Sequence, residues 1–274
     1  MKLFRILMIL AMVSAMPFIN SCSDDDDNGP TGPGDEKDYY PTAANTWWVY
    51  NVEYQDYEGN NMGSDKDSTV IAEETQHDGK TAYEFESHTD YDAESSNYDN
   101  KNSEYFYRDG AKFYTRTSYV LPNDPEDLDL PFDAIPDQWI KIADADASGW
   151  TVLEAEISDE TVDIGGFPVT LNADYTVEAK NNGEKQVTFD NGETVTAMEY
   201  VLTTNIKGTV SAIIVSDDID FDVVTKLYFA EDLGMVKQVV EPARLTVNVG
   251  NGLTFDVEGH TMILKSSSLT TVVD

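Results

Sequence analysis

Apolar and polar residues alternate along much of this chain with a period of two, the period of a β-strand that buries one face. Because successive strand side chains point to opposite faces of a sheet, Trp48 is expected to enter the core and its neighbour Trp47 to point away from it. The alternation is clear in four segments: 48–54, 82–86, 245–249 and 253–257. We therefore predict strands in all four.

Residue pairs suited to tight turns separate the strand-like segments. Two-residue loops that contain glycine supply the positive φ angles that antiparallel hairpins require. The pairs are Asp78-Gly79, Asp109-Gly110, Gly165-Gly166, Asn182-Gly183, Asn191-Gly192 and Asn251-Gly252. Beyond the N-terminus the sequence shows no amphipathic helical pattern. Together these features predict an all-β fold, an antiparallel meander that forms a curved half-barrel or an open barrel.

The N-terminal segment has the features of a secretory signal. Lys2 and Arg5 precede an apolar run over residues 6–16. This run is too short to span a bilayer core, which needs about 20 helical residues, so it predicts a signal peptide rather than an anchoring helix. The signal ends at Cys22, the only cysteine of the sequence. A single cysteine excludes both an internal disulfide framework and a cysteine-rich zinc site.

Residues 19–22, with the sequence Ile-Asn-Ser-Cys, resemble the lipobox of bacterial lipoproteins, in which the cysteine is lipidated and becomes the mature N-terminus. The resemblance implies that residues 1–21 are the signal peptide and that Cys22 carries the lipid. The acidic run that follows resembles the surface-export signal of lipoproteins from the Bacteroidota, with a simple solvated spacer as the alternative. This run consists of Ser23, Asp24, Asp25, Asp26 and Asp27. Residues 22–38 are then a disordered acidic tether.

The remaining residues, 39–274, suit a single β domain, because all-β domains can reach this length. Residues 121–136 are rich in proline and acidic side chains. They separate a tyrosine-rich front half from a back half that is rich in valine and threonine. A domain boundary and a long loop within one curved sheet explain this stretch equally well.

Two motifs of this domain resemble uncharacterised Bacteroidota surface or outer-membrane lipoproteins. Tyr40-Pro41 followed by residues 45–50 resembles their opening, and residues 226–237 resemble one of their late hairpins. Such proteins look akin to periplasmic lipoprotein-carrier (LolA/LppX-like) half-barrels, in which a curved antiparallel sheet wraps an apolar cavity. The motifs cover a small part of the chain, so the resemblance implies a fold and transfers no functional residues.

The charge of the chain excludes one class of partner. The sequence holds 52 acidic residues against 17 Lys and Arg, a formal net charge of -35. Nucleic-acid binding needs clustered cations that neutralise phosphates, so we expect no nucleic-acid partner. With 41% hydrophobic residues the chain can nevertheless bury a substantial core.

No catalytic constellation stands out in the sequence. His77, His88 and His260 do not lie at zinc-ligand spacing, and no Gly-x-Ser-x-Gly nucleophile motif occurs. Two carboxylates could serve a glycoside hydrolase, but a chain with this many acids always contains pairs at suitable separation. Whether the protein is an enzyme stays open, and the sequence favours a non-enzymatic role.

One segment resembles a calcium-binding loop. Asp144, Asp146 and Ser148 stand at its first, third and fifth positions, followed by Gly149. The twelfth position, where a bidentate glutamate belongs, is Ala155. We therefore expect no cofactor and keep calcium as the one metal alternative, with an Asp-rich turn as the other interpretation.

Aromatic residues are the best candidates for ligand contact. Exposed rings near carboxylates and amides can stack on the apolar face of a sugar, although the same residues also pack well in a sheet. The candidates are Trp47, Tyr105, Tyr107 and Tyr114. Separately, residues 67–69 resemble the O-glycosylation sequon of exported Bacteroidota proteins, which would make Ser68 the modified residue in a loop-to-strand region.

These observations lead to one functional hypothesis and two alternatives. The hypothesis is a lipoprotein of the outer membrane, held there by its N-terminal lipid and facing the exterior, that binds a glycan or an apolar small molecule without catalysis. The alternatives are a carboxylate-dependent glycoside hydrolase and a structural or assembly lipoprotein of an outer-membrane complex. The sequence names no protein partner.

Overall fold

The computed structural model describes residues 38–89, 100–121, 135–164, 167–212, 215–248 and 253–269. The chain divides into two compact units, Met1–Glu36 and Lys37–Asp274, and every described residue belongs to the second. Cys22, the acidic run 23–27 and the pairs Gly165-Gly166 and Asn251-Gly252 lie outside the described residues. Across the part of the chain that the structure describes, no helix combines the length and the apolar character needed to cross a membrane.

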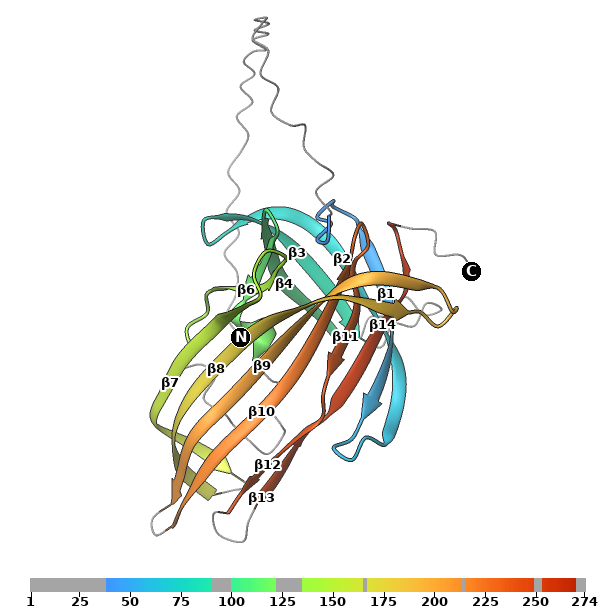
Figure 1. The fold of residues 1–274 in the computed structure, drawn as a ribbon. Coiled ribbons are helices and arrows are strands. Elements are labelled where there is room, and N and C mark those ends of the chain that lie inside the picture. The colour runs from blue at the N-terminus through green and yellow to red at the C-terminus, as the bar shows by residue number, and fades with distance from the viewer. Residues whose placement is uncertain are drawn as a thin grey trace, which may run out of the picture. The chain divides into compact units, whose positions relative to one another are not determined.

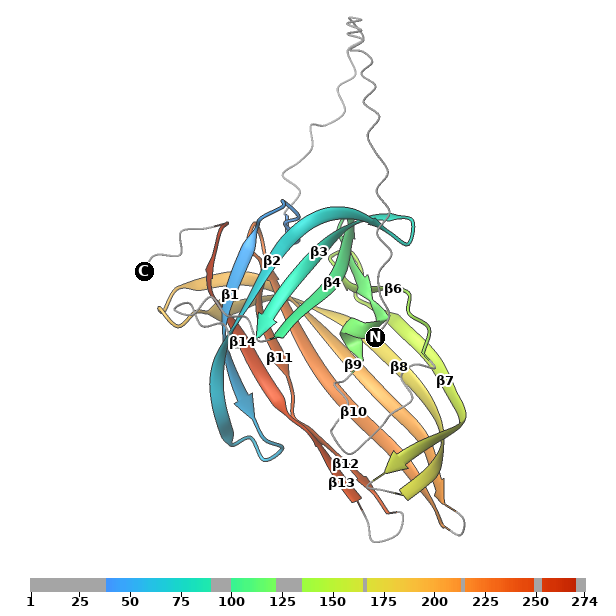
Figure 2. The ribbon, with the colours of Figure 1, turned by 180° about the vertical axis from the view of Figure 1, so that it is seen from behind.

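The described residues are almost entirely β-strand (Figures 1 and 2). A single short 3₁₀-helix, η1 (Thr117–Val120), interrupts the strands of this part of the chain. The strands are β1 (Trp47–Gln55), β2 (Asn61–His77), β3 (Lys80–Thr89), β4 (Asn100–Asp109), β5 (Lys112–Arg116), β6 (Trp139–Asp144), β7 (Gly149–Ile164), β8 (Phe167–Thr188), β9 (Thr194–Ala212), β10 (Val215–Ala230), β11 (Gly234–Val240), β12 (Ala243–Val247), β13 (Leu253–Val257) and β14 (Gly259–Ser267).

Twelve of these strands form one antiparallel sheet in the order β6-β5-β4-β3-β2-β1-β14-β11-β10-β9-β8-β7. The order is a meander in which β14 returns to lie between β1 and β11, so the first and second halves of the chain join in one sheet. Its two edge strands, β6 and β7, are consecutive, and the Trp150 indole nitrogen of β7 donates a 2.7 Å hydrogen bond to the Lys141 carbonyl of β6. The prediction of an all-β antiparallel meander that curves into a half-barrel or open barrel is confirmed.

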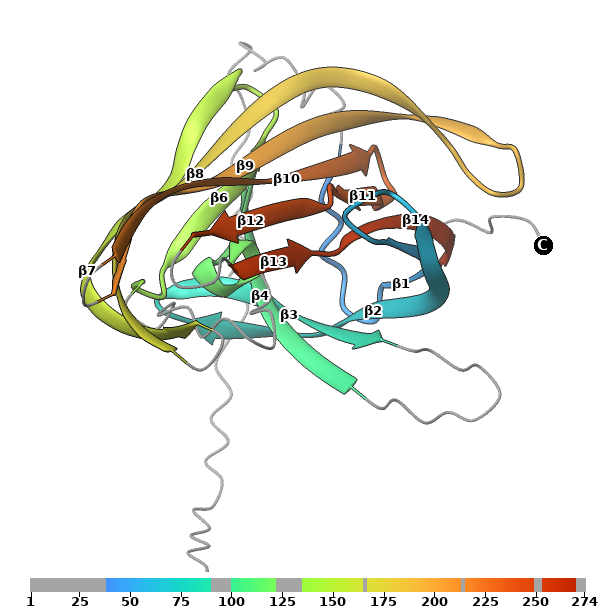
Figure 3. The same cartoon turned by 90° about the horizontal axis from the view of Figure 1, so that it is seen from below.

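The hairpin of β12 and β13 forms a separate two-stranded sheet. It lies on the concave side of the large sheet, beside β10 (Figure 3). Leu245 and Val247 of β12 are buried in the core, and the Asn248 backbone nitrogen donates a 2.6 Å hydrogen bond to the Asp217 carboxylate of β10. The hairpin thereby covers apolar surface that the curved sheet alone would expose.

The buried apolar side chains of the described residues form two clusters. The larger gathers residues of β4 to β10 and β12, and the smaller gathers residues of β1, β2, β8, β9, β10, β11 and β14. Phe85 and Met235 pack against both clusters. The alternation in β1 has the predicted phase, since Trp48 is 3% exposed and Trp47 is 40% exposed.

One predicted turn is not a turn. Asn182-Gly183 lies inside β8, where the pairing with β9 shifts between Asn181 and Glu184. The chain forms a bulge at this point. The Gly183 φ angle is 74°, and the Gly183 backbone nitrogen donates a 2.9 Å hydrogen bond to the Asn181 side chain. A bulge and a tight turn use the same glycine conformation, so the local sequence could not distinguish them. The prediction was wrong, and β8 continues past the pair as a long strand.

Candidate ligand cavity

A cavity of about 230 Å³ lies at the boundary between the two core clusters. Residues of β1 to β6, β10, β11 and β14 line it, together with η1 and the segment that precedes β1. Most of the lining is aromatic or methionine. The curved sheet therefore encloses space that its own side chains do not fill, whereas protein interiors are normally close-packed.

Stacked rings form the aromatic wall of the cavity. Trp48 of β1 and Phe85 of β3 lie parallel with ring centroids 5.9 Å apart, and Phe106 and Phe113 stack at 5.1 Å. The Trp48 indole nitrogen donates a 2.7 Å hydrogen bond to the Leu233 carbonyl, so its orientation is fixed. Phe106 and Phe113 come from the adjacent strands β4 and β5, whereas β2 lies between the strands that carry Trp48 and Phe85.

Tyr40 contributes a ring from outside the sheet. Its segment precedes β1, and its side chain stacks on Phe113 at 4.8 Å and meets the Phe229 ring edge-on at 5.1 Å. Its hydroxyl lies 3.1 Å from the Tyr200 hydroxyl of β9. Tyr40 therefore ties the start of the compact unit to the wall of the cavity.

The polar lining comes mainly from β2, β3 and β4. Asp67 and Thr69 are alternate residues of β2 and share its inner face, where they pair with Tyr50 and Trp48 of β1. The Thr69 hydroxyl lies 3.2 Å from the Ser87 hydroxyl of β3. Two carboxylates, an amide and two hydroxyl residues thus interrupt an otherwise apolar surface: Asp67, Glu104, Gln238, Thr69 and Ser87.

The Asp67 carboxylate lacks some of the hydrogen-bond and cation partners that a carboxylate in a protein interior normally has. Its Oδ1 atom is buried and has no hydrogen-bond partner among the described residues. Burial, with a smaller contribution from Asp65, raises the pKa of the Asp67 carboxyl to about 6. Among the described residues that line the cavity there is no Lys, Arg or His. A buried carboxylate without a cation or a full set of donors is energetically unfavourable.

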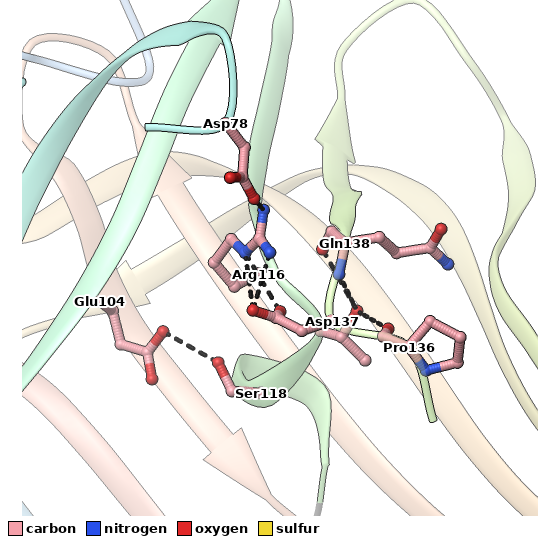
Figure 4. Close-up of polar contacts among 8 residues, drawn as sticks. Asp78, Glu104, Arg116, Ser118, Pro136, Asp137 and Gln138 are labelled. Carbon is pink, nitrogen blue, oxygen red and sulfur yellow. Dashed lines mark hydrogen bonds and ion pairs between the residues drawn. The ribbon is translucent and has the colours of Figure 1, made fainter. Parts of the chain in front are cut away.

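Glu104 lines the cavity next to η1. The Ser118 hydroxyl of η1 donates a 3.3 Å hydrogen bond to the Glu104 carboxylate (Figure 4). Burial raises the pKa of the Glu104 carboxyl, although the Ser118 hydrogen bond opposes the shift. Tyr119 of η1 lines the cavity as well, and its ring meets Phe106 edge-on at 5.5 Å.

An ion-pair network holds η1 in place. Arg116, whose side chain is 8% exposed, contacts Asp78 at 2.6 Å and Asp137 at 2.7 Å (Figure 4). The Thr117 hydroxyl donates a 3.1 Å hydrogen bond to the Pro136 carbonyl. The network joins the β2–β3 turn, the start of η1 and the residues before β6, which positions Tyr119 at the cavity and Ser118 beside Glu104.

Replacing Asp67 by Asn is expected to stabilise the empty protein, and only at higher pH. The folded state raises the pKa of Asp67 from 3.8 to about 6, so the folded protein is favoured while this carboxyl is protonated. That contribution is complete below pH 3.8 and is lost as the pH rises through about 6. At about pH 8 we expect Asp67→Asn to raise the free energy of unfolding by about 1 kcal/mol, allowing for partial solvent screening. At about pH 3 we expect no change.

Chemical denaturation of both proteins at the two pH values measures this effect. Glu74→Gln is the control, because Glu74 is an exposed acid of the same strand that neither lines the cavity nor affects the pKa of Asp67. If Asp67→Asn raised the free energy of unfolding equally at both pH values, the destabilisation could not come from the ionised Asp67 side chain.

The structure places three of the four aromatic candidates together, on the outer face of β4 and β5. Tyr107 stacks on Tyr114 with ring centroids 4.4 Å apart and meets Trp139 edge-on at 4.8 Å. Tyr105 stacks on His77 at 4.0 Å. Trp47 is on β1 and does not line the cavity. A role of these four residues in ligand binding stays a prediction.

The residues of the calcium-like loop form a turn between β6 and β7. The Asp144 carboxylate is buried, contacts the Lys141 ammonium at 2.5 Å and accepts a 3.0 Å hydrogen bond from the Asp146 backbone nitrogen. Together with this backbone hydrogen bond, the Lys141 ammonium lowers the Asp144 pKa, against an opposing effect of burial. In the described ranges no three His, Cys, Asp or Glu residues come close enough to hold a metal ion.

Ser68 lies within β2 rather than at a loop-to-strand junction. It occupies the face opposite Asp67 and Thr69, its neighbours in the sequence. Its modification stays a prediction.

The cavity carboxylates Asp67 and Glu104 were not among the sequence candidates for ligand contact. Every residue of segment 64–69 is polar, so the sequence pattern there does not show which side chains face the core. Around Phe106 both faces carry rings, so the pattern was ambiguous there too. The strand register supplied the missing information.

No protein-family model matches this chain, and no match was found among curated proteins. A solved structure described as a "putative lipoprotein" from Parabacteroides distasonis ATCC 8503 is similar, with 14% sequence identity and a TM-score of 0.44. The match covers 86% of this chain and 100% of that one. Similarity at this level does not assign a family or a function.

Proposed function

We propose that this protein is a binding module that holds a small, mainly apolar ligand in the cavity of its curved sheet and does not transform it. The observation that carries the proposal is the cavity itself, about 230 Å³ lined by stacked aromatic rings with a few polar groups on one side. Binding sites for small molecules combine an apolar lining with a few polar groups that orient the ligand. The cavity is smaller than the roughly 300–1,000 Å³ of pockets for drug-sized ligands, so the ligand is small.

The proposed setting is the outer membrane. A lipid on Cys22 would anchor the protein, and the acidic residues of segment 23–38 would keep the compact unit away from anionic head groups. The resemblance of residues 19–27 to lipoprotein signals supports this setting, including the exterior orientation. Metabolic labelling of the expressed chain with a fatty-acid analogue tests it, and Cys22→Ser should abolish the label.

A cavity-filling variant tests the binding site. We expect a neutral fluorescent probe, phenylnaphthylamine, to bind the protein with an increase in fluorescence, and Met262→Trp to reduce its affinity at least about tenfold. Met262 lines the cavity from β14, so a larger side chain there occupies the space of the ligand. Thr261→Trp is the control, since adjacent strand residues face opposite sides. Equal binding by all three proteins would place the probe outside the cavity.

Hydrolysis of a glycoside is the second candidate. The observation that favours it is that Asp67 and Glu104 line one cavity, each with a raised pKa. Glycosidases keep one carboxyl group protonated as the acid and use a second as nucleophile or base. Release of chromophore from small aryl glycosides, abolished by Asp67→Asn or Glu104→Gln, would favour this candidate over binding alone.

A glycan could also contact the outer face of β4 and β5. The partly exposed rings of Tyr105 and Tyr114 lie there with Trp139. A glycan array compared between the parent chain and Tyr105→Ala tests this interaction separately from the cavity.

A further inference from the structure

We propose that the natural ligand of the cavity is a cation, a small amine whose aryl or alkyl part packs against the aromatic wall while its ammonium group pairs with Asp67. This inference rests on the proposed function, because it names the chemical class of the ligand for the same site. It adds what the shape of the cavity does not determine, the sign of the ligand's charge.

The first argument is an unbalanced charge. Buried carboxylates are normally paired with a cation or hydrogen-bonded by several donors. Asp144 follows this rule through Lys141. Asp67 does not, since its Oδ1 atom is buried with no partner in the described part of the chain, and no basic residue among those described lines the cavity. An ammonium group supplies both the charge and the donor that are missing.

The second argument is the surrounding aromatic surface. Asp67 is paired across the strands with Tyr50, and Thr69, two residues further along the same face, is paired with Trp48. Directly opposed residues in a sheet have their Cβ atoms about 4.5–5.5 Å apart, so Asp67 is a close neighbour of Tyr50, and both residues line the cavity together with Trp48. Ring faces attract cations, most strongly where water is excluded. Carboxylate and rings therefore favour the same kind of ligand group.

The third argument is the field of the whole molecule. Residues 39–274 alone hold 45 acidic residues against 14 Lys and Arg. Such an excess raises the local concentration of cations and repels anions. An anionic ligand, such as a fatty-acid carboxylate, would also have to be buried in a cavity that already contains Asp67 and Glu104. The negative charge of the chain and of the cavity therefore disfavours a fatty acid, although the apolar wall alone would accept one.

The preference should depend on pH. Among the described residues, the titratable groups that face Asp67 or line the cavity with it are acidic or phenolic: Asp65 on β2, Tyr50 and Tyr54 on β1, Glu104 on β4, Tyr119 on η1, and Tyr39 and Tyr40 before β1. An ammonium group binds the ionised carboxylate, so amine affinity is full above the pKa of Asp67, about 6, and falls as the pH drops below it. The decrease approaches about tenfold for each pH unit.

Three probes that share one apolar part test the proposal. Phenylbutylamine, phenylbutanol and phenylbutyrate are cationic, neutral and anionic at about pH 8. Isothermal titration calorimetry on the full chain gives their affinities. We expect the amine to bind most tightly and the carboxylate most weakly. Asp67→Asn should weaken the amine about tenfold to a hundredfold and leave the alcohol unchanged, as expected for loss of a charge-assisted contact.

Two further variants make the result specific. Glu74→Gln removes an exposed negative charge from the same strand without altering the lining, so amine affinity should stay within about twofold. Glu104→Gln removes the second carboxylate and should weaken the amine as well. Thermal unfolding confirms that each variant is folded.

The outcomes separate the two proposals. Equal affinities of amine and alcohol, or an amine affinity that Asp67→Asn does not change, would overturn the cationic ligand and leave the binding function standing. Absence of binding by all three probes would overturn the binding function and, with it, the ligand class.

Discussion

Replacing Tyr40 by Ala is expected to destabilise the compact unit by about 3–5 kcal/mol, as removal of a buried aromatic ring does. Tyr40 is 3% exposed and contacts three aromatic residues, Phe113, Phe229 and Tyr200. Its loss leaves a void beside an existing cavity and releases the segment before β1. In a domain of this size we expect the melting temperature to fall by about 10 °C, measured by circular dichroism.

Tyr40→Phe is the control, because it keeps the ring and removes only the hydroxyl that contacts the Tyr200 hydroxyl. Its expected cost is about 1 kcal/mol. If the Ala and Phe variants melted within a degree or so of each other, the ring would not be an integral part of the core, and the description of Tyr40 as a wall of the cavity would be wrong.

Gly208→Ala is expected to destabilise the protein by about 3 kcal/mol although it adds a single methyl group. A Cβ atom on Gly208 of β9 would lie 2.0 Å from the Asn172 carbonyl oxygen and 2.5 Å from the Ala173 Cα atom of β8. Both are backbone atoms, so the clash can be relieved only by separating two of the longest strands of the sheet. Urea denaturation measures the change.

Lys207→Ala provides the comparison on the neighbouring residue. Lys207 is exposed and pairs with the exposed Asp220 at 2.8 Å, so its loss should leave the free energy of unfolding nearly unchanged. A similarly small cost for Gly208→Ala would show that β8 and β9 do not approach each other as closely as described.

The alternation of residues predicted the fold class and much of the core because a period of two is a property of the strand itself. It also separated Trp47 from Trp48 correctly. Asn182-Gly183 shows the limit of local patterns, since the pair forms a bulge whose nature depends on the pairing of β8 with β9. The insertion of β14 between β1 and β11 joins segments distant in sequence, and nothing in either segment alone indicates it.

The candidate site was less predictable than the fold. Tyr105, Tyr107 and Tyr114 were selected as aromatic candidates, and the structure places them on the outer face of the sheet, where their rings stack on neighbouring side chains. The inner face is defined by register, and only register shows that Asp67 points into an apolar cavity. In a chain with 52 acidic residues, one carboxylate in an unusual environment cannot be recognised from composition.

Asp67 connects the stability of the protein with its proposed function. Its ionised side chain is unfavourable in the empty cavity, yet the same carboxylate is the group that a bound amine would satisfy. Binding sites often retain a polar group that reduces stability, because its interactions are completed only by the ligand.

The most direct test of the cavity as the binding site is a crystal structure of the protein with phenylbutylamine. We predict that the phenyl ring lies against Trp48 and Phe85 and that the ammonium group lies within hydrogen-bond distance of Asp67. A ligand bound on the outer face of β4 and β5 while the cavity holds none would contradict the account.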